Sequence, residues 1–315
     1  MGMTALSIAA GDWERVDAGT LAWLKAVHFV DADHGWIAGG SGTFLKTTDG
    51  GKTWQREKVT RDNIRDVVFT DRENGWLLCE QSIFGPGIES PTYILRTQNG
   101  GSTWEKVSIE PGRERMLRLV LSPTANVAYA IGETGTMLFT NSLEDTWKRT
   151  ALATQTMLTD GKILNDKEAI LVGGRGTILR TDNGGITWTE VKAHDNEPPR
   201  KLNAVYFIDD KKGWAVGAEG KILITENGGN TWFPEASGVT TDLLDVIFLD
   251  NAVGDNAAGF AVGDAGTIIQ TKDSGKTWIK MDSGTKHRLE RIVRSGNKLI
   301  AAGFGGTVLI KQFRK

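Results

Sequence analysis

The sequence predicts an all-β protein folded as a seven-bladed β-propeller, with the last blade closed by the N-terminal strand. Two observations predict this fold: an eight-residue segment recurs six times at intervals of 41 to 50 residues, and short alternating apolar segments lie between the copies. A period in the forties fits four short strands per repeat, which make one propeller blade. We therefore expect one repeating domain, although a length of 315 residues would otherwise suggest two.

The recurring segment, which we call the box, has an acidic or polar residue at its third position and ends in Thr-Trp. Its six copies are TTDGGKTW from Thr47, TQNGGSTW from Thr97, TNSLEDTW from Thr140, TDNGGITW from Thr181, TENGGNTW from Thr225 and TKDSGKTW from Thr271. The copies end at Trp54, Trp104, Trp147, Trp188, Trp232 and Trp278. Trp13 lies 41 residues before Trp54 and continues the series without a box.

Each repeat divides into four predicted strands. A short outer strand follows the tryptophan, and a variable loop leads to an inner strand with alternating apolar residues, as in AVHF from Ala26, DVVF from Asp66, AVYF from Ala204 and DVIF from Asp245. A second strand often opens with Gly-Trp, as at Gly35, Gly75 and Gly213, and a Gly-x-x-Gly turn leads to the third. Period-two alternation bounded by Gly, Asn and Asp is typical of strands.

The third strands number seven, and they indicate how the ring closes. They contain Phe44-Leu45, Ile94-Leu95, Met137-Leu138, Ile178-Leu179, Ile222-Leu223, Ile268-Ile269 and Val308-Leu309. The last has no box after it, whereas an unpaired outer strand, Trp13 to Val16, stands at the other end. Pairing the two leaves only short, protected edges. Residues 11–315 are thus predicted to form one propeller, and residues 1–10 a tail or signal-peptide remnant.

The box residues are predicted to be structural, because one similar residue per blade at the periphery is architecture rather than a catalytic or metal array. At the third position, Asp49, Asn99, Asn183, Asn227 and Asp273 are expected to accept backbone N–H bonds two residues on. Gly51 supplies a positive φ, and Thr47 and Thr53 add hydroxyl bonds. Each tryptophan is expected to bury its ring between blades and donate its N–H to a carbonyl. Ser142 and Glu144 predict an altered turn in the third copy.

Composition excludes several classes of protein. The net charge of −2 argues against a dedicated nucleic-acid binder. The single cysteine, Cys79, allows neither an intrachain disulfide nor a cysteine-based zinc site. The four histidines show no ligand spacing, and no apolar stretch reaches the roughly 18 residues of a membrane span. We expect no metal, no cofactor and a monomer.

The boxes are Asp-box, or BNR, repeats, which sialidases, some glucanases and the photosystem II stability/assembly factor family carry. The chain resembles the last of these from Gly11 to Phe313, with HGWIAGGSGTFLKTTDGGKTW from His34 and KGWAVGAEGKILITENGGNTW from Lys212 as the diagnostic segments. The resemblance implies a non-catalytic factor, exported to the periplasm or thylakoid lumen. It further implies binding to a newly made membrane-complex subunit through an arginine-rich patch. The chain departs from the family in lacking a complete signal peptide and in an insertion from Cys79 to Tyr93.

The partner site is predicted on the face where loops between blades and the second-to-third-strand turns emerge. The basic residues assigned to these loops are Arg61, Arg65, Arg113, Arg115, Arg118, Arg175, Arg200, Lys201 and Arg288, with Lys286 and His287 beside them. The arginine fork matches carboxylates in bidentate geometry. Phe84, Ile88 and Tyr93 in the insertion are candidates for an apolar anchor, since interface hot spots favour aromatics and arginine.

An Asp-box carbohydrate-active enzyme is the main alternative, and a module associated with an envelope transporter is a minor one. Glu133, Glu219 and Asp264 lie in turns that surround one mouth of a propeller, where two carboxylates could face each other. A sialidase also needs a Tyr–Glu nucleophile pair, and none of Tyr93, Tyr129 and Tyr206 lies near a suitable glutamate. We therefore predict no catalytic residues.

Overall fold

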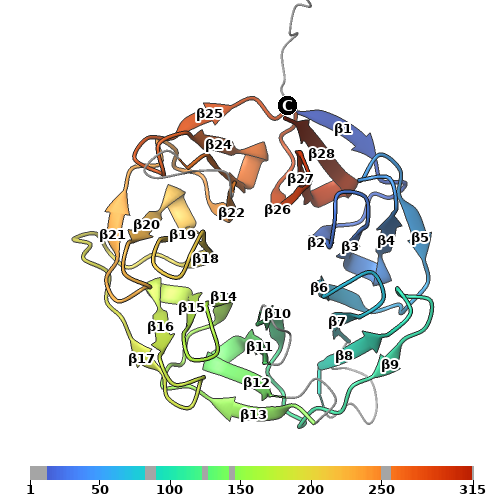
Figure 1. Cartoon of the computed structure of the whole chain (residues 1–315), viewed down its shortest axis with the longest axis horizontal. Coiled ribbons are helices and arrows are strands. Elements are labelled where there is room, and N and C mark those ends of the chain that lie inside the picture. The colour runs from blue at the N-terminus through green and yellow to red at the C-terminus, as the bar shows by residue number, and fades with distance from the viewer. Residues whose placement is uncertain (1–12, 82–89, 123–126, 142–145, 250–256, 314–315) are drawn as a thin grey trace, which may run out of the picture.

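The computed structural model describes residues 13–81, 90–122, 127–141, 146–249 and 257–313. These residues form seven four-stranded antiparallel sheets, arranged as blades around a common axis (Figure 1). In six blades the chain runs from the innermost strand outward in order, and the seventh combines the two ends of the chain. The predicted all-β, seven-bladed propeller is confirmed.

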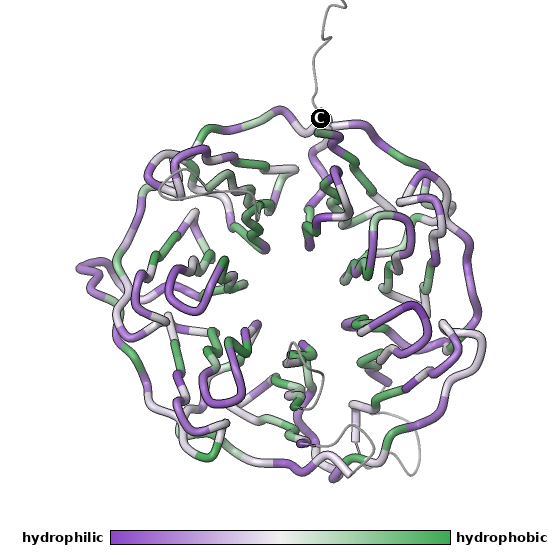
Figure 2. Tube along the Cα trace, viewed as in Figure 1, coloured by the Kyte–Doolittle hydropathy of each residue, from purple (hydrophilic) through white to green (hydrophobic). Residues whose placement is uncertain are grey.

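The two inner layers of the ring hold most of the buried side chains, and apolar positions concentrate there (Figure 2). The innermost strands are β2 (Leu24–Phe29), β6 (Asn63–Phe69), β10 (Met116–Leu121), β14 (Leu158–Ile163), β18 (Leu202–Phe207), β22 (Leu243–Phe248) and β26 (Leu289–Ser295). The second strands are β3 (Gly35–Gly39), β7 (Gly75–Glu80), β11 (Ala128–Gly132), β15 (Ala169–Gly173), β19 (Gly213–Gly217), β23 (Gly259–Gly263) and β27 (Lys298–Gly303).

The two outer layers complete each blade, and the residues of the outermost strands are mostly exposed. The third strands are β4 (Phe44–Thr47), β8 (Thr92–Thr97), β12 (Thr136–Thr140), β16 (Ile178–Thr181), β20 (Ile222–Thr225), β24 (Ile268–Thr271) and β28 (Thr307–Gln312). The outermost strands are β5 (Gln55–Glu57), β9 (Glu105–Lys106), β13 (Lys148–Ala151), β17 (Thr189–Glu190), β21 (Phe233–Glu235), β25 (Ile279–Met281) and β1 (Glu14–Asp17).

The N-terminal strand closes the ring as predicted. Strand β1 pairs antiparallel with β28 and places Val16 opposite Val308. Just before it, Trp13 is 6% exposed and packs edge-on against Phe260 at a centroid distance of 6.3 Å. The outermost strand of the seventh blade therefore comes from the opposite end of the chain, which locks the ring.

The Gly-Trp pair that opens several second strands has a steric cause. A Cβ atom on Gly35 would lie 2.5 Å from the ring of Phe29, the last residue of the neighbouring inner strand, and a Cβ on Gly213 would lie 2.7 Å from Phe207. Glycine is required because the phenylalanine ring covers this backbone. The following tryptophan packs against the next blade: Trp214 stacks on Phe248 at 3.5 Å between centroids. The pair thus joins packing within a blade to packing between blades.

The box turns are closed by the predicted side chains, with one difference in register. Asp49 Oδ1 accepts the backbone N–H of Thr53 at 3.0 Å, and the hydroxyl of Thr47 donates to the same carboxylate at 2.8 Å. The backbone bond spans four residues, not the two expected, because the turn continues through two glycines with φ of 73° and 84°, Gly50 and Gly51. These hydrogen bonds outweigh burial and lower the pKa of Asp49 to about 2.

The amide boxes keep the same geometry. Asn99 Oδ1 accepts the N–H of Thr103 at 2.9 Å, and its amide nitrogen donates to the Thr103 hydroxyl at 2.7 Å. Asn183 and Asn227 repeat this pattern, and Asp273 repeats that of Asp49. The altered turn predicted at Ser142 and Glu144 lies outside the described residues.

The box tryptophans differ in burial and in hydrogen bonding. The indole N–H of Trp104, Trp188 and Trp232 donates to the carbonyl of the glycine three residues before it, as expected. The expectation is wrong for the others: the indole nitrogens of Trp54, Trp147 and Trp278 are buried and have no hydrogen-bond partner among the described residues. Trp147 and Trp232 are fully buried, Trp278 nearly so, and Trp54, Trp104 and Trp188 only partly.

Replacing Trp232 by alanine is expected to lower the free energy of unfolding by about 3–5 kcal/mol, the usual cost of emptying a buried aromatic site. Trp188→Ala is the matched control, because Trp188 makes the same N–H bond to a glycine carbonyl but is only half-buried. Urea unfolding followed by circular dichroism measures both. Equal losses in the two variants would contradict the assignment of the stabilisation to burial.

Candidate partner-binding face

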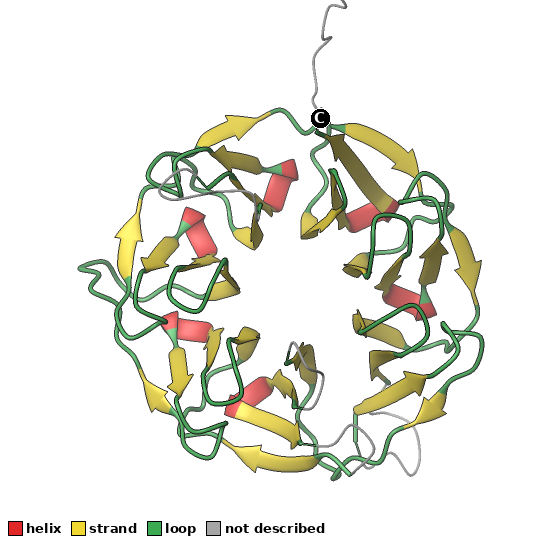
Figure 3. Cartoon of the chain, viewed as in Figure 1, coloured by secondary structure: helices red, strands yellow, loops and turns green. Residues whose placement is uncertain are grey.

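One face of the ring carries both kinds of connection that the sequence singled out. The second and third strands are joined there by short 3₁₀ turns: η1 (Gly40–Gly42), η2 (Glu133–Gly135), η3 (Gly174–Gly176), η4 (Ala218–Gly220), η5 (Asp264–Gly266) and η6 (Phe304–Gly306) (Figure 3). Connections between blades pack against these turns, as in the bond from Gly306 N–H to the Ala22 carbonyl at 2.8 Å. We call this surface the η face, and the opposite surface, with the Asp-box turns, the box face.

The inner strands have a register that repeats around the ring. Each is paired with its second strand through a one-residue shift near its start, as between Leu24 and Ala26. The residues at the shift are Lys25, Arg65, Leu117, Thr159, Asn203, Leu244 and Glu290. All seven line one cavity at the channel mouth. A β-bulge redirects a side chain, and here it turns one residue per blade toward the axis.

The channel mouth on the η face is strongly basic. Its cavity, of about 170 Å³, is lined by the bulge residues together with Met157, Lys201, Arg288 and Arg291. Of the described residues that line it, five are cationic and Glu290 alone is acidic. The cations are Lys25, Arg65, Lys201, Arg288 and Arg291. Low-dielectric walls lined by one sign of charge focus the electrostatic field, so this mouth favours anionic groups.

Two lysines at the mouth have pKa values that reflect this crowding. Burial, together with repulsion from Arg65 and Arg288, lowers the pKa of Lys25 to about 8, although Glu290 opposes the shift. Burial and repulsion from Arg288 also lower the pKa of Lys201. An incoming carboxylate would offset both penalties, because it would favour the charged form of each lysine.

Glu290 holds the mouth together as its internal counter-ion. Its Oε1 accepts the Trp23 indole N–H at 2.5 Å and the Arg288 Nε at 3.0 Å, and it lies 3.5 Å from the Lys25 ammonium. One carboxylate therefore serves three donors, whereas the buried Nε of Arg291 finds no hydrogen-bond partner in the described part of the chain. Among the side chains that line the mouth, positive charge therefore remains in excess.

Arg118 lies one level deeper, inside the ring. Its guanidinium contacts two carboxylates on neighbouring blades: Nε lies 2.9 Å from Asp160 Oδ1, and Nη1 lies 3.2 Å from Asp66 Oδ1. Burial opposes its charge, but these carboxylates outweigh burial and raise the pKa of Arg118. Each carboxylate also accepts a backbone N–H from the next blade: Asp66 accepts that of Leu119, and Asp160 accepts that of Val205. Arg118 is thus occupied within the fold.

Several of the predicted arginines form ion pairs on the η face. Arg65 contacts Glu80, and Arg115 lies 3.5 Å from the same carboxylate and 3.9 Å from Glu133. Arg200 contacts Glu219, and Arg288 lies 2.8 Å from Asp264. These pairs reduce the positive charge that the face presents.

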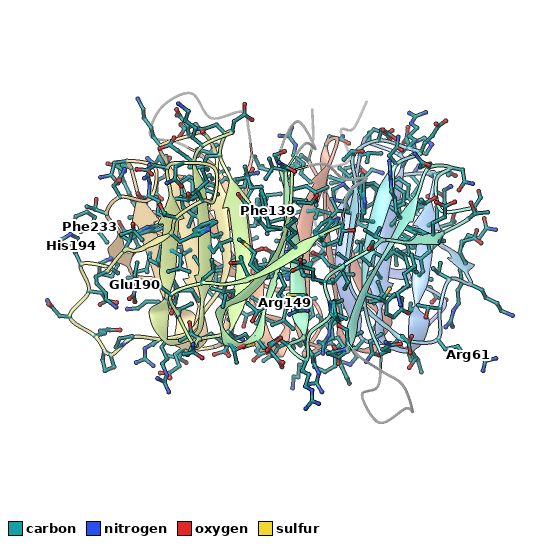
Figure 4. The ribbon with its side chains drawn as sticks, turned by 90° about the horizontal axis from the view of Figure 1, so that it is seen from below. Arg61, Phe139, Arg149, Glu190, His194 and Phe233 are labelled. Carbon is teal, nitrogen blue, oxygen red and sulfur yellow. The ribbon has the colours of Figure 1, made fainter. Side chains whose placement is uncertain are left out.

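Three predicted arginines remain exposed and unpaired. Within the described part of the chain, Arg61, Arg113 and Arg175 have no ion-pair or hydrogen-bond partner. Arg61 projects from the edge of the ring in the side view, far from His194 and Phe233 on the outer wall (Figure 4). Arg175 stands at the tip of η3 with a φ of 53°, in the left-handed conformation that each described η turn adopts at its centre.

Two expectations about this face need correction. Arg65 and Arg118 were predicted in loops, but they lie on the inner strands β6 and β10, because these strands begin earlier than their apolar alternation indicates. Tyr93, predicted as an exposed anchor, is 8% exposed on β8 and donates its hydroxyl to Asp62 at 2.8 Å. Phe84 and Ile88 lie outside the described residues.

Sequence reasoning missed Lys25 and Arg291, although a signal was present. Lys25 directly precedes the AVHF segment just as Arg65 precedes DVVF, so aligning the inner strands would have placed both residues at one level. Arg291 lies one residue after the shift in β26, at the level of Arg118.

None of the helices in the described part of the chain has the length and apolar character that a membrane span needs.

The fold and its repeats define a class of protein: a closed seven-bladed propeller built on Asp-box turns. A family model described as "Photosynthesis system II assembly factor YCF48" matches residues 6–112 and 139–236. The match covers more than half of the chain, so the chain belongs to this family.

Curated relatives share parts of the chain. The Photosystem II assembly lipoprotein Ycf48 of Synechococcus sp. (strain CC9902) is 23% identical over 206 residues, which are 62% of this chain and 57% of the relative. The Photosystem II assembly protein Ycf48 of Synechococcus sp. (strain JA-3-3Ab) is 26% identical, over 62% of this chain and 83% of that protein. The stability/assembly factor HCF136 of Oryza sativa subsp. japonica is 44% identical, over 16% of this chain and 13% of that protein. The chain thus spans little more than half of the first relative.

Solved structures have the same fold. One titled "YCF48 bound to D1 peptide" aligns with a TM-score of 0.73 at 22% identity, over 100% of both chains. YCF48 from Cyanidioschyzon merolae aligns with the same TM-score and identity, over 95% of this chain and 98% of that one. The WD40 propeller domain of Doa1 also reaches 0.73, at 12% identity, over 96% of this chain and 98% of that one. At these identities the likeness shows the fold.

Proposed function

We propose that this protein is a non-catalytic assembly factor that binds a subunit of a membrane protein complex, of the photosystem II type in a photosynthetic host, through the η face. The observation that carries the proposal is the basic channel mouth, which is lined by five cationic side chains and one carboxylate, although Arg65 and Arg288 also pair with Glu80 and Asp264 outside the lining. Membership of the assembly-factor family and the D1 peptide named in a related structure supply the class of partner.

The chemistry of the face favours an acidic peptide segment. Arg61, Arg113 and Arg175 form an exposed outer set whose guanidinium groups are available for carboxylates. Lys25, Lys201 and Arg291 form an inner set at the mouth. An extended segment with acidic side chains would contact the outer set first and then neutralise the mouth. Relatives named lipoproteins support our expectation of export to the periplasm or thylakoid lumen.

The carbohydrate-active alternative finds no support in the turn acids. Glu133 pairs with Arg115, Glu219 with Arg200, and Asp264 with Arg288. A glycosidase needs one carboxyl group held protonated and a second facing it across the scissile bond. Each of the three turn acids is instead engaged in an ion pair with an arginine of the η face.

The triple variant Arg61→Glu, Arg113→Glu, Arg175→Glu is expected to abolish partner capture without loss of stability, because all three side chains are exposed and unpaired. The measurement is affinity capture from gently solubilised membranes of the native organism, with the captured subunits identified by mass spectrometry. A peptide from the host's D1 subunit, or from the identified subunit, then gives the Kd by titration calorimetry.

The matched control is Lys52→Glu, Lys211→Glu, Lys272→Glu. It makes the same change of charge at exposed positions on the box face. Capture that survives the η-face variant, or that is lost equally in both variants, would contradict the assignment of the η face. Wild-type capture of no membrane-complex subunit would contradict the proposed function itself.

A further inference from the structure

The η face carries an exposed apolar cluster at the seam where the ring closes. Leu21 is 85% exposed, Phe304 48% and Trp23 38%. Trp23 and Phe304 pack edge to face at 5.6 Å between ring centroids, and the connection that carries Leu21 is hydrogen-bonded to η6. We call Leu21, Trp23 and Phe304 the seam patch. The other large, exposed apolar side chains among the described residues, Ile186, Phe233 and Ile279, lie outside this face.

The seam patch is held in place by its own backbone. Asp17 Oδ1 accepts the N–H of Gly19 at 2.8 Å, and the Thr20 hydroxyl oxygen accepts the N–H of Ala22 at 3.1 Å. The Ala22 carbonyl then accepts the N–H of Gly306 at 2.8 Å. Leu21 therefore projects from a fixed turn, and binding to it needs little ordering of the protein.

At the three positions of the seam patch, the matching residues of the other blades are mostly polar or small. The backbone carbonyl of Thr20, the residue before Leu21, lies against Gly306 of η6. In other blades the equivalent carbonyl is followed by a polar residue: Arg61, Gln155, Thr240 or Lys286. The η-turn residues that match Phe304 are Gly40, Glu133, Gly174, Ala218 and Asp264. Those that match Trp23 are Arg115, Met157, Lys201, Asp242 and Arg288. The fold does not require apolar residues at these sites, so their joint occurrence at one seam needs another explanation.

The seam patch is continuous with the basic mouth. The Lys25 ammonium lies 3.0 Å from the centroid of the Trp23 ring, and the Arg288 guanidinium carbon lies 5.9 Å from it. The Trp23 indole donates to Glu290, which lines the mouth. An apolar group over Trp23 and an anionic group beside Lys25 would thus lie within one or two residues of each other, at roughly 3.3–3.6 Å per extended residue.

We propose that the seam patch binds an aromatic or branched aliphatic side chain of an extended peptide whose neighbouring acidic side chains enter the basic mouth. This inference rests on the proposed function and specifies the partner's chemistry: an apolar residue one or two positions from an acidic pair. The cations give the segment its attraction and orientation, whereas the seam patch gives it an anchor and a fixed register.

The test compares two peptides that differ only at the anchor. Both are acetylated and amidated and carry Glu-Glu followed, after one residue, by Phe or by Ser. The wild-type protein is expected to bind the Phe peptide about tenfold more tightly, as follows from burying about half of one aromatic side chain. The double variant Leu21→Ser, Phe304→Ser is expected to lose this tenfold preference and to bind the Ser peptide as the wild type does.

The matched control is Ile186→Ser, Ile279→Ser, which removes two other exposed apolar side chains away from the η face; it is expected to keep the preference. Equal binding of both peptides by the wild type would overturn the seam patch inference and leave the proposed function standing. Binding of neither peptide would overturn both.

Two further outcomes would assign the seam patch to another occupant and so overturn the inference. One is a concentration-dependent dimer in sedimentation velocity that the Leu21→Ser, Phe304→Ser variant abolishes. The other is co-sedimentation with phosphatidylcholine vesicles that the same variant abolishes. A monomeric wild type that ignores the vesicles and prefers the Phe peptide supports the peptide anchor.

Discussion

Replacing Arg118 by methionine is expected to lower the free energy of unfolding by about 3–5 kcal/mol, since it leaves buried charges without their partner. Arg118 bridges Asp66 on the second blade and Asp160 on the fourth, at 3.2 and 2.9 Å. Both carboxylates are almost fully buried. Methionine keeps most of the volume of the side chain, so the loss reports the charge rather than a cavity.

The measurement is urea unfolding at neutral pH, with Arg113→Met as the control. Arg113 is exposed and unpaired, so its replacement is expected to change stability by no more than about 0.5 kcal/mol. Removing all three charges, in the triple variant Asp66→Asn, Asp160→Asn, Arg118→Met, is expected to recover part of the loss. An Arg118→Met protein as stable as the wild type would show that the network does not stabilise the ring.

Deleting the N-terminal segment through Asp17 is expected to cost about 5 kcal/mol or more, the largest effect predicted for this protein. It removes the buried Trp13 ring, which alone accounts for about 3–5 kcal/mol. It also removes β1, so β28 becomes an unpaired edge along the four positions from Thr307 to Ile310. An exposed edge of this kind pairs readily with another chain.

Urea unfolding and sedimentation velocity measure the two consequences, which are lower stability and concentration-dependent association. Glu14→Lys is the control, because the Glu14 side chain is exposed and the substitution keeps the backbone pairing with Ile310. A truncated protein that stays monomeric and unfolds at the wild-type urea concentration would contradict closure by β1 as a source of stability.

Much of this architecture could be predicted from local sequence patterns. The box, from Thr47 to Trp54, closes through bonds within five residues of one another, so its geometry is local. The third strands and the seven-blade count follow from the same repetition. The N-terminal strand pairs as predicted because Trp13 continues the spacing of the boxes.

The composition of the candidate site was harder to predict. Arg113 and Arg118 are five residues apart and were expected to act together, but one faces solvent and the other lies inside the ring. The one-residue shift between Met116 and Arg118 separates them, because it reverses the side-chain alternation at that point. Alternation alone does not reveal such a shift, so the inward position of Arg118 could not be derived from it.

The number of blades, the closing strand and the turn chemistry can be predicted from the amino-acid pattern, because each depends on residues close in the chain or on their period. Which charges meet depends on the three-dimensional arrangement of the blades. Asp66 and Asp160 lie 52 and 42 residues from Arg118, and Lys25 and Glu290 come from opposite ends of the chain. Closing the ring brings these residues to one axis. An unpaired charge is costly there, so the buried carboxylates pair with Arg118, and cationic side chains outnumber acidic ones in the lining of the mouth.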